Sequence, residues 1–554
     1  MMKKLFSMIL ALVLSATVVA SLAACGPRGT QGNGNANVVE PDMSLEETLT
    51  IDWLCPIQDT LAVTETPMIQ YIEKKFNVIL EAQQQQPSAH DQRVELLISR
   101  QEIPTMLTRI SVARANEYGD YGAFLNIEPY LEYMPNFLKI IDRAVEENAN
   151  NASILYDTEG RIYRVPNYTP NAYPIYNFSY NKTAFTEVGY PEPKTWNEVY
   201  LALKALKEKY PSSYPFAARK TDEGMSLTLN DFVISFTGGY GNSQEFYGYN
   251  PDTDQFELSL DIEGFKEAIQ FFNKLYTEGL VDPEFTSMDG NVLLDRVQNR
   301  RVFMLCDFNG GFTGYSAEEE RTRELYPLHL PSPTDDPKDA TYGFRVANFD
   351  TAAGTAIDGE VTKDPLLLGR VLQIIDYMYS DEFINIQWYH PNVTQGSYPD
   401  GTNAATADPT TYRYLLDADG NKQYKPEIYE KANIGDVINN YFNWSVYANF
   451  YNLNDPVCDP VRFAPFYEFR NELITDTDKY VDVPTPVLTA REYKQVTAKN
   501  SLVKARFEMR INEFLTQPFT DADWEAFVTE LENEGGSELI EVYNEAYGRN
   551  LENS

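Results

Sequence analysis

The sequence predicts an α/β fold built as two interleaved lobes. Strand-like and helix-like segments alternate near the beginning of the chain, at 48–53, 67–76, 78–80, 90–100 and 103–108. This β-α-β-α-β order implies a parallel sheet with right-handed crossovers. The chain has 554 residues and single cores stop growing at about 250–300 residues, so two or more folding units are expected. Beyond the N-terminal region no low-complexity linker or repeat divides the sequence, which favours interleaved lobes over domains joined end to end.

Later elements follow from local signals. A capping box from Thr195 to Glu198 predicts a helix that runs through Leu206, with Trp196 as a structural residue in its first turn. Residues 250–255, with the sequence NPDTDQ, predict a hairpin turn. Apolar residues recur at helical spacing in four further stretches, which predict amphipathic helices at 265–276, 368–379, 524–531 and 539–547.

The chain is strongly acidic. It has 45 Lys and Arg residues against 82 Asp and Glu residues, which gives a formal charge of −37. Affinity for nucleic acids depends on Lys and Arg side chains that neutralise phosphates, so nucleic acid is not an expected partner. The 43% of hydrophobic residues, with 38 Tyr and 30 Phe, is enough to build large cores and excludes global disorder.

The N-terminus has the form of a targeting segment. Two lysines precede an apolar run, and the sequence LAAC that ends at Cys25 resembles the bacterial lipobox. The sequence therefore predicts a signal peptide at 1–24 and a lipid on Cys25; an uncleaved anchor is the alternative, because the apolar run just suffices to span a bilayer. Residues 25–47 begin with a Gly- and Asn-rich stretch and predict a flexible tether. The body is thus expected outside the cell, held at the membrane by its lipid anchor.

Cysteines and histidines suggest no metal site. Three cysteines remain once Cys25 carries lipid, and at most one disulfide can form among Cys55, Cys306 and Cys458. Buried thiols are the simpler interpretation, and which of them pair, if any do, stays open. The spacing of Cys and His fits no zinc motif, and no cofactor is expected. Two acidic runs at 417–421 and 476–482 lack the Gly and Glu of an EF-hand loop and are interpreted as solvated turns.

Five short motifs occur in a characteristic order. They are LISRQEIPT at 97–105, YGAFLNIEPYL at 121–131, DTEGRIYRVP at 157–166, YNK at 180–182 and VGYPEPKTW at 188–196. Their order and spacing resemble family 1 of the extracellular solute-binding proteins of ABC importers, in particular the large lipoproteins of Gram-positive bacteria. The family has a "DGKIYGLP" segment where this chain has 157–166. Residues 100–102 depart from the family's small-Gly-Asp turn, and residues 308–345 and 390–470 align with no motif.

The resemblance implies a periplasmic-binding-protein-like fold of type II, with a hinge between two lobes. It places lobe 1 at about 48–172 and 300–365, and lobe 2 at about 173–299 and 366–551. It also implies a monomeric binding protein without enzymatic activity, which closes around a sugar or oligosaccharide and delivers it to ABC permease subunits in the membrane.

Sugar binding requires aromatic faces and hydrogen-bonding side chains, and the sequence offers candidates for both. The candidate ligand-binding residues are Trp53, Arg109, Tyr173, Phe308, Asn309, Trp388 and Trp444. Trp53 and Arg109 follow strands whose carboxyl ends should border the ligand. A core position for Trp53 and a plain surface position for Arg109 are the alternatives, and one of the last two tryptophans is expected in a core.

Two other functions remain open at the level of sequence. A surface-anchored carbohydrate-active enzyme would hide an acid/base pair among the many carboxylates. A receptor that presents its ligand to a membrane sensor would share the fold but not the permease.

Overall fold

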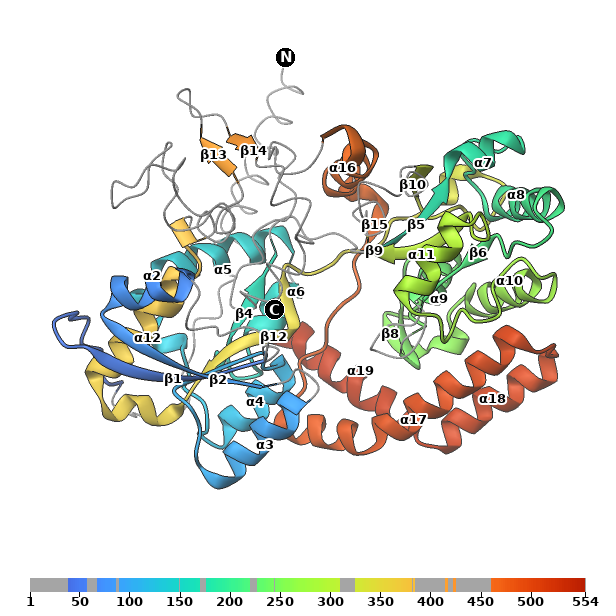
Figure 1. Cartoon of the computed structure of the whole chain (residues 1–554). Helices are drawn as coiled ribbons and strands as arrows, with labels where there is room; N and C mark the ends of the chain where they lie inside the picture. The colour runs from blue at the N-terminus through green and yellow to red at the C-terminus, as the bar shows by residue number, and fades with distance from the viewer. Residues whose placement is uncertain are drawn as a thin grey trace, which may run out of the picture.

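The structure is a computed structural model, and it describes most of the chain after residue 37. The described residues are 38–56, 67–85, 89–148, 150–169, 176–219, 227–243, 245–308, 324–380, 382–383, 414–416, 422–424 and 460–553. Figure 1 shows two lobes side by side, one blue to cyan with a yellow strand, the other green, and long orange-red helices beneath them. The expected signal peptide, Cys25 and most of the tether lie outside the described residues.

Lobe 1 is built on a five-stranded sheet of order β2-β1-β3-β12-β4. Its strands are β1 (Leu49–Cys55), β2 (Val78–Gln84), β3 (Met106–Thr108), β4 (Val165–Tyr168) and β12 (Phe349–Ile357). Strand β1 is parallel to both β2 and β3, which confirms the predicted parallel sheet, whereas β12 is antiparallel to β3 and β4. The helices that cover it are α2 (Pro67–Phe76), α3 (His90–Arg100), α4 (Val112–Asp120), η3 (Glu128–Tyr133), α5 (Pro135–Glu147), α6 (Asn150–Leu155), η8 (Gly359–Lys363) and α12 (Pro365–Tyr377).

Lobe 2 is built on a four-stranded sheet of order β10-β5-β9-β6. Its strands are β5 (Tyr176–Asn181), β6 (Phe216–Ala217), β9 (Met304–Phe308) and β10 (Leu325–Leu328), with the hairpin β7 (Tyr247–Asn250) and β8 (Gln255–Leu258). Its helices are α7 (Lys182–Glu187), α8 (Trp196–Lys209), α9 (Leu227–Phe236), η4 (Ser259–Asp261), α10 (Phe265–Thr277), α11 (Gly290–Gln298), α17 (Ala490–Thr516), α18 (Asp521–Asn533) and α19 (Gly536–Asn553). The remaining elements are η7 (Pro337–Asp339), β11 (Gly343–Phe344), β13 (Tyr414–Leu416), β14 (Lys422–Tyr424), α16 (Pro460–Thr475), η10 (Thr477–Lys479) and β15 (Tyr480–Val481).

The predicted capping box opens α8, since the Thr195 side chain accepts from the Glu198 backbone and the Glu198 carboxylate accepts from the Thr195 backbone. The next residue, Trp196, is 1% exposed and stacks on Phe232 with ring centroids 4.0 Å apart, as a structural residue should. The hairpin turn is also confirmed, and a helix stands at each of the four stretches where an amphipathic helix was predicted.

Each lobe has its own hydrophobic core. The large core of lobe 1 gathers residues of β1, α2, α5 and α12, and the large core of lobe 2 gathers residues of β5, α8, α9 and α10. The three C-terminal helices also contribute to the core of lobe 2, through residues such as Phe507, Phe527 and Leu539. The sequence did not predict α17, the longest of them.

The predicted lobe boundaries are wrong in two places. Residues 300–328 were expected in lobe 1, but β9 and β10 both pair with β5 in the sheet of lobe 2, because the apolar run of β9 fills the position between β5 and β6. Residues 366–379 were expected in lobe 2, but α12 is buried on nearly all sides and packs in lobe 1 against α2 and α5. The chain thus returns to lobe 1 at β12 and stays there through α12.

The strand directions make one edge of each sheet face the other lobe. Only residues 169–175 connect the end of β4 to the start of β5, a span of at most about 25 Å. The ends of β1, β2 and β3 lie at the same edge as the end of β4, since β12 is antiparallel to both β3 and β4. In lobe 2 the ends of β6 and β9 lie beside the start of β5. We call these the lobe 1 edge and the lobe 2 edge.

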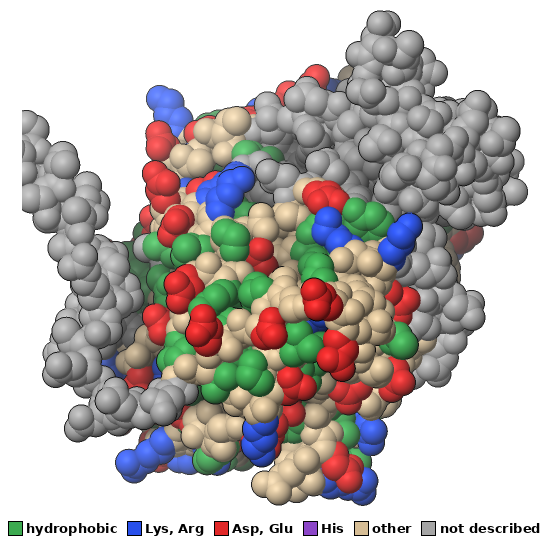
Figure 2. All heavy atoms as spheres, turned by 90° about the vertical axis from the view of Figure 1, so that its left-hand side faces the viewer, with side chains coloured by type: hydrophobic (Ala, Val, Ile, Leu, Met, Phe, Trp, Pro, Cys, Tyr) green, Lys and Arg blue, Asp and Glu red, His purple; other side chains and the backbone are tan. Residues whose placement is uncertain are grey.

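Acidic side chains are spread over the surface. Figure 2 shows the side of lobe 1, where Asp and Glu side chains are scattered among apolar and neutral ones over the described part of that face. None of the described helices combines the length and the hydropathy that a membrane span requires. On the described part of that face the acidic side chains are therefore not concentrated in one patch.

Candidate functional site

Arg109 stands at the lobe 1 edge, directly after β3. It is exposed and its backbone has a φ of 61°, a left-handed conformation that is uncommon for a residue other than Gly. The next residue holds it there: Ile110 is 1% exposed, and its N–H donates to the Gly354 carbonyl at 3.0 Å. Arg109 has no hydrogen-bond or ion-pair partner among the described residues. The structure thus places an exposed arginine, with its backbone held by the next residue, at the predicted position.

A buried arginine lies beneath Arg109. Arg164 is 2% exposed and donates to the carbonyls of Ile110 at 3.2 Å, Ala353 at 2.8 Å and Asp350 at 2.6 Å. Burial lowers the pKa of this guanidinium to about 10, which leaves it charged at neutral pH. Its partners come from the segment after β3 and from a bulge in β12, so one side chain joins the segments that form the lobe 1 edge.

Gly354 makes room for this arrangement. A Cβ at this position would lie 2.6 Å from Nη1 of Arg164 and 2.8 Å from the Val165 carbonyl, so the guanidinium and the bulge both require glycine here. The sequence carried a signal for this feature, because Arg164 stands where the family's "DGKIYGLP" segment has a glycine. The arginine in place of glycine could be seen in the sequence, but its role could not be predicted, because it binds carbonyl groups of β12, a strand that the sequence did not predict.

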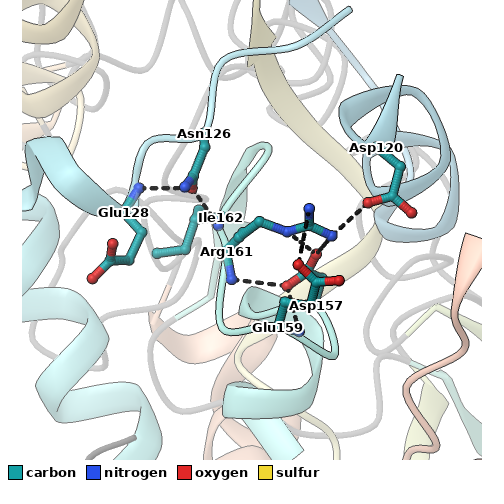
Figure 3. A network of polar contacts seen from close by, with 7 residues as sticks. All are labelled: Asp120, Asn126, Glu128, Asp157, Glu159, Arg161 and Ile162. Carbon is teal, nitrogen blue, oxygen red and sulfur yellow. Dashed lines mark hydrogen bonds and ion pairs between the residues drawn. The ribbon is translucent and has the colours of Figure 1, made fainter. Parts of the chain in front are cut away.

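A polar network fixes the loop that leads into β4. Figure 3 shows the Asp157 carboxylate between the backbone of Glu159 and Arg161, and the Arg161 side chain between Asp157 and Asp120. Asn126 accepts from the Ile162 N–H at 3.0 Å and so ties this loop to the neighbouring chain. The network lies at the beginning of β4, away from the lobe 1 edge, and gives the 157–166 motif a structural role.

The lobe 2 edge carries an ion pair. Arg219 follows β6 and binds Asp307 of β9 in a bidentate manner, with Nε–Oδ2 at 2.6 Å and Nη2–Oδ1 at 2.8 Å. Asp307 is only 3% exposed, whereas Arg219 is half-buried. Paired planar groups of this kind offer both donors and acceptors to a hydroxyl-rich molecule. The sequence analysis missed both residues, although Asp307 immediately precedes the predicted Phe308.

A carboxylate and a thiol lie behind this pair. The Cys306 thiol donates to Oδ2 of Asp231 on α9 at 2.9 Å, and burial raises the pKa of Asp231 to about 6. Cys306 and Cys55 are both buried thiols, as predicted; Cys458 lies outside the described residues. Within the part of the chain that the structure describes, no group of three or more His, Cys, Asp or Glu side chains could hold a metal ion.

The structure places Trp53 in the core of lobe 1, not at its edge. Its side chain is 0% exposed, because β1 continues to Cys55 and the tryptophan lies inside the sheet, under the helices. The prediction that Trp53 contacts a ligand is therefore wrong for this conformation, and the alternative of a core tryptophan holds. Phe308 is the last residue of β9, at the lobe 2 edge, but only its backbone is described. The other four candidates lie outside the described residues: Tyr173, Asn309, Trp388 and Trp444.

Comparisons with known proteins agree with this architecture. Residues 112–344 match the family model described as bacterial extracellular solute-binding protein. Lipoprotein LipO of Bacillus subtilis (strain 168) is 22% identical over 502 residues, which cover 87% of this chain and 89% of LipO. The multiple sugar-binding protein of Streptococcus mutans serotype c is 27% identical over 153 residues, 27% of this chain and 34% of that protein.

Two solved structures share the fold at low sequence identity. One is a solute-binding protein of Bifidobacterium longum infantis described as HMO-binding and ABC-transporter-associated, with a TM-score of 0.67, 16% identity, and coverage of 91% of this chain and 99% of that one. The other is the substrate-binding protein FusA of S. pneumoniae in complex with kestose, with a TM-score of 0.67, 16% identity, and coverage of 91% and 100%.

These comparisons confirm the predicted two-lobe α/β fold. They also bear on activity, because the matched family and the similar structures are substrate-binding proteins and not enzymes. The alternative of a carbohydrate-active enzyme is thereby not supported. The family match over residues 112–344, the LipO alignment over most of both chains and the two-lobe fold together make this chain similar to the bacterial extracellular solute-binding proteins.

Proposed function

We propose that this protein is the lipid-anchored receptor of an ABC importer, that it captures a carbohydrate, and that the carbohydrate is an oligosaccharide. The observation that carries the proposal is the pair of facing edges, with Arg109 on lobe 1 and the Arg219–Asp307 pair on lobe 2. In open α/β sheets ligands bind outside the carboxyl ends of the strands, and both edges are such ends.

Polar groups lie on both lobes, so a solute that contacts them all stabilises the closed state. A solute that contacts Arg109 and the Arg219–Asp307 pair together binds the closed state better than the open one, and the closed population grows by that differential affinity. Each hydrogen bond to a charged side chain contributes about 1.5–3 kcal/mol. Three or four such bonds with one aromatic stack reach the roughly −8 kcal/mol of micromolar binding.

Sugars of more than one unit are favoured by the chemistry of similar proteins. One similar structure is described as HMO-binding and another as a complex with kestose, and one matched relative is called a multiple sugar-binding protein. We carry the class over to this chain as a proposal, together with Cys25 as the lipidated residue, permease subunits as partners and a monomeric state for the protein. Phe308, Asn309, Tyr173, Trp388 and Trp444 remain proposed ligand contacts.

The direct test is a thermal-shift screen of the mature protein against glycans, peptides and polyols. A true solute at 100 times its dissociation constant adds about 2.7 kcal/mol of stability. The variant Asp307→Asn should raise the dissociation constant of that solute by tenfold or more, because it breaks the bidentate pair and leaves the charge of Arg219 without its carboxylate partner. Stabilisation by peptides alone, with no effect of any glycan, would refute the carbohydrate proposal.

Lipidation and import are tested separately. Cys25→Ala should release the protein from the membrane into the culture medium, since the acyl chains supply the anchor. Deleting the partner permease should abolish uptake of the solute and leave its binding unchanged. A ligand response that survives this deletion would instead support a receptor that serves a membrane sensor.

A further inference from the structure

Two buried asparagines lie on one face of strand β5, four residues apart. Asn177 is 4% exposed and Asn181 is 5% exposed, and their even spacing puts both side chains on the same side of the sheet. The amide of Asn181 has a partner for each of its two atoms: Oδ1 accepts from the Ala184 N–H at 2.8 Å, and Nδ2 donates to Oε2 of Glu324 at 2.7 Å. Asn181 thus caps helix α7 and stabilises the end of β5 that is remote from the lobe 2 edge.

The amide of Asn177, at the lobe 2 edge, is only half satisfied. Its Nδ2 donates to the Phe178 carbonyl at 2.5 Å and lies 3.4 Å from Oγ of Ser179. Its Oδ1 is buried and has no hydrogen-bond partner among the residues that the structure describes. The reverse orientation of the amide would bring its oxygen against the Phe178 carbonyl and so place two acceptors in contact. The unpartnered atom is therefore the carbonyl oxygen, which can only accept a hydrogen bond.

An unpartnered buried acceptor destabilises the folded state. Taking such a group out of water without giving it a donor costs free energy, and folded proteins pair nearly all of their buried polar atoms. Where the unpartnered atom borders a proposed binding site, a donor from the bound molecule explains why the residue is kept. Asn177 meets this condition, whereas Asn181 is satisfied by the protein itself.

Asn177 stands beside the ion pair of the lobe 2 edge. It lies directly opposite Asp307 in the antiparallel pairing of β5 with β9. Residues opposite each other in such a pair project from the same face, with Cβ atoms about 4.5–5.5 Å apart. The Asp307 carboxylate is 3% exposed and binds Arg219 in a bidentate manner. The edge therefore combines two neighbouring acceptors with one donor group, an arrangement that suits two adjacent hydroxyl groups.

We propose that Asn177 is a further solute-binding residue, whose amide oxygen accepts a hydrogen bond from one hydroxyl of the captured saccharide while the Arg219–Asp307 pair binds the neighbouring hydroxyl. The inference rests on the proposed function, which it narrows to saccharides that present two adjacent unsubstituted hydroxyls to lobe 2. The oxygen is buried in the described conformation, so the solute reaches it through a local movement of the kind that accompanies lobe opening and closure. Such a site rejects an analogue that lacks the matching hydroxyl, because the acceptor then stays unpaired.

The first test asks whether Asn177 is kept for stability, and it needs no solute. Asn177→Leu removes the unpartnered carbonyl, so the full mature chain should unfold at the wild-type midpoint temperature or above it. Asn177→Ala, which adds no bulk, repeats the comparison in case leucine does not fit. Asn181→Leu is the matched control on the same face of β5, and it should lower the midpoint by at least about 2 °C, because it removes a helix cap.

The second test measures recognition of the hydroxyl by titration calorimetry. The probes are kestose, mannotriose, maltotriose and xylotriose, followed by the monodeoxy forms of each trisaccharide that binds. One deoxy form should bind the wild type at least tenfold more weakly than its parent. Asn177→Leu should bind the parent and that deoxy form with the same reduced affinity, because both then lack the hydrogen bond. Asn181→Leu should keep the tenfold difference.

The outcomes separate this inference from the proposed function. A fall in the midpoint of Asn177→Leu and Asn177→Ala as large as that of Asn181→Leu makes Asn177 a structural residue and overturns the inference. A tenfold deoxy effect that survives Asn177→Leu also overturns it, and leaves the proposed function standing. If none of the four trisaccharides binds and no glycan shifts the melting of the protein, both proposals fail.

Discussion

At the scale of single residues, two buried arginines, Arg164 and Arg370, stabilise lobe 1 by donating hydrogen bonds to backbone carbonyl groups. Arg370 of α12 is 0% exposed and donates to the carbonyls of four residues: Ser44, Glu47, Phe76 and Asn77. These carbonyls belong to the segment before β1 and to the end of α2. Arg370 therefore joins the first described residues of the chain to the core of lobe 1, and fixes where the proposed tether leaves the body.

Arg370→Met is expected to destabilise lobe 1 by about 3 kcal/mol, because it keeps the volume but leaves several buried carbonyls without donors. Urea unfolding measures the loss, and proteolysis near residue 47 should accelerate as the segment detaches. Arg143→Met, on the exposed face of α5, is the control and should cost less than about 0.5 kcal/mol. Equal losses in the two variants would contradict the role given to Arg370.

His90 makes the stability depend on pH. It is 1% exposed at the start of α3, and burial lowers its pKa below the usual 6.5, opposed in part by the backbone of Thr108. The unfolded chain therefore takes up a proton near pH 6.5 that the folded chain does not. The free energy of unfolding should fall as the pH falls through this range, by at most about 1.4 kcal/mol per pH unit for this group.

His90→Leu should remove part of this dependence between about pH 5 and pH 7, as measured by urea unfolding at several pH values. A further part is expected from His329, whose pKa burial also lowers although Glu472 opposes the shift. His329→Gln in the same protein should remove that part, whereas Asp231, whose pKa burial raises to about 6, should keep a contribution of the opposite sign. A His90→Leu profile parallel to that of the wild type would show that His90 is not the titrating group.

At the scale of elements, helix ends with side-chain caps offer local tests. The reciprocal hydrogen bonds between Thr195 and Glu198 satisfy two backbone donors at the start of α8, a helix that packs into the core of lobe 2. Thr195→Ala should cost about 1 kcal/mol, within the usual range for loss of a cap, and thermal unfolding should report it. Thr195→Ser keeps the hydroxyl and should retain most of the stability; a loss as large as that of Ala would mean that the cap is not the cause.

The elements also show how far sequence patterns reach. Helices α2 and α3 begin and end where their apolar spacing predicts, because each has one face toward the core. Strand β12 was not predicted, because its sequence FDTAAGTAI has small residues and no clear alternation of apolar and polar side chains. It becomes a strand by pairing with β3 and β4. Helix α17 was not predicted either, because its buried residues, such as Val496, Val503 and Phe507, are few and far apart in a helix of 27 residues.

A residue of the candidate site could be predicted only where the strands that place it had been predicted. The position of Arg109 at the lobe 1 edge was predictable because the residue follows a strand of a parallel sheet, and its contact with a solute stays a prediction. Arg164 and Asp307 were not, because their neighbours come from strands far away in sequence: β12 for the first and β6 for the second. Trp53 was misplaced because the length of β1 decides whether a side chain lies at the edge or in the core.

At the scale of the whole molecule, separate cores predict separate unfolding. Four of the clusters of described core residues belong to one lobe or the other. Helix α17 reaches lobe 1 through Lys494, which lies 3.5 Å from Glu117 of α4 and donates to the Tyr121 hydroxyl. Polar surface contacts of this kind contribute at most about 1 kcal/mol each. The lobes should therefore unfold in two calorimetric transitions without solute, as multidomain proteins commonly do.

The two stability variants assign these transitions. Arg370→Met should lower only the transition of lobe 1, and Thr195→Ala only that of lobe 2, by about 2–4 °C per kcal/mol for units of this size. Saturating solute should raise the midpoint temperatures of both transitions and bring the two temperatures closer together, because a ligand held by both edges couples the unfolding of one lobe to that of the other. A solute that shifts only one transition binds only one lobe, and closure would then not be its mechanism of capture.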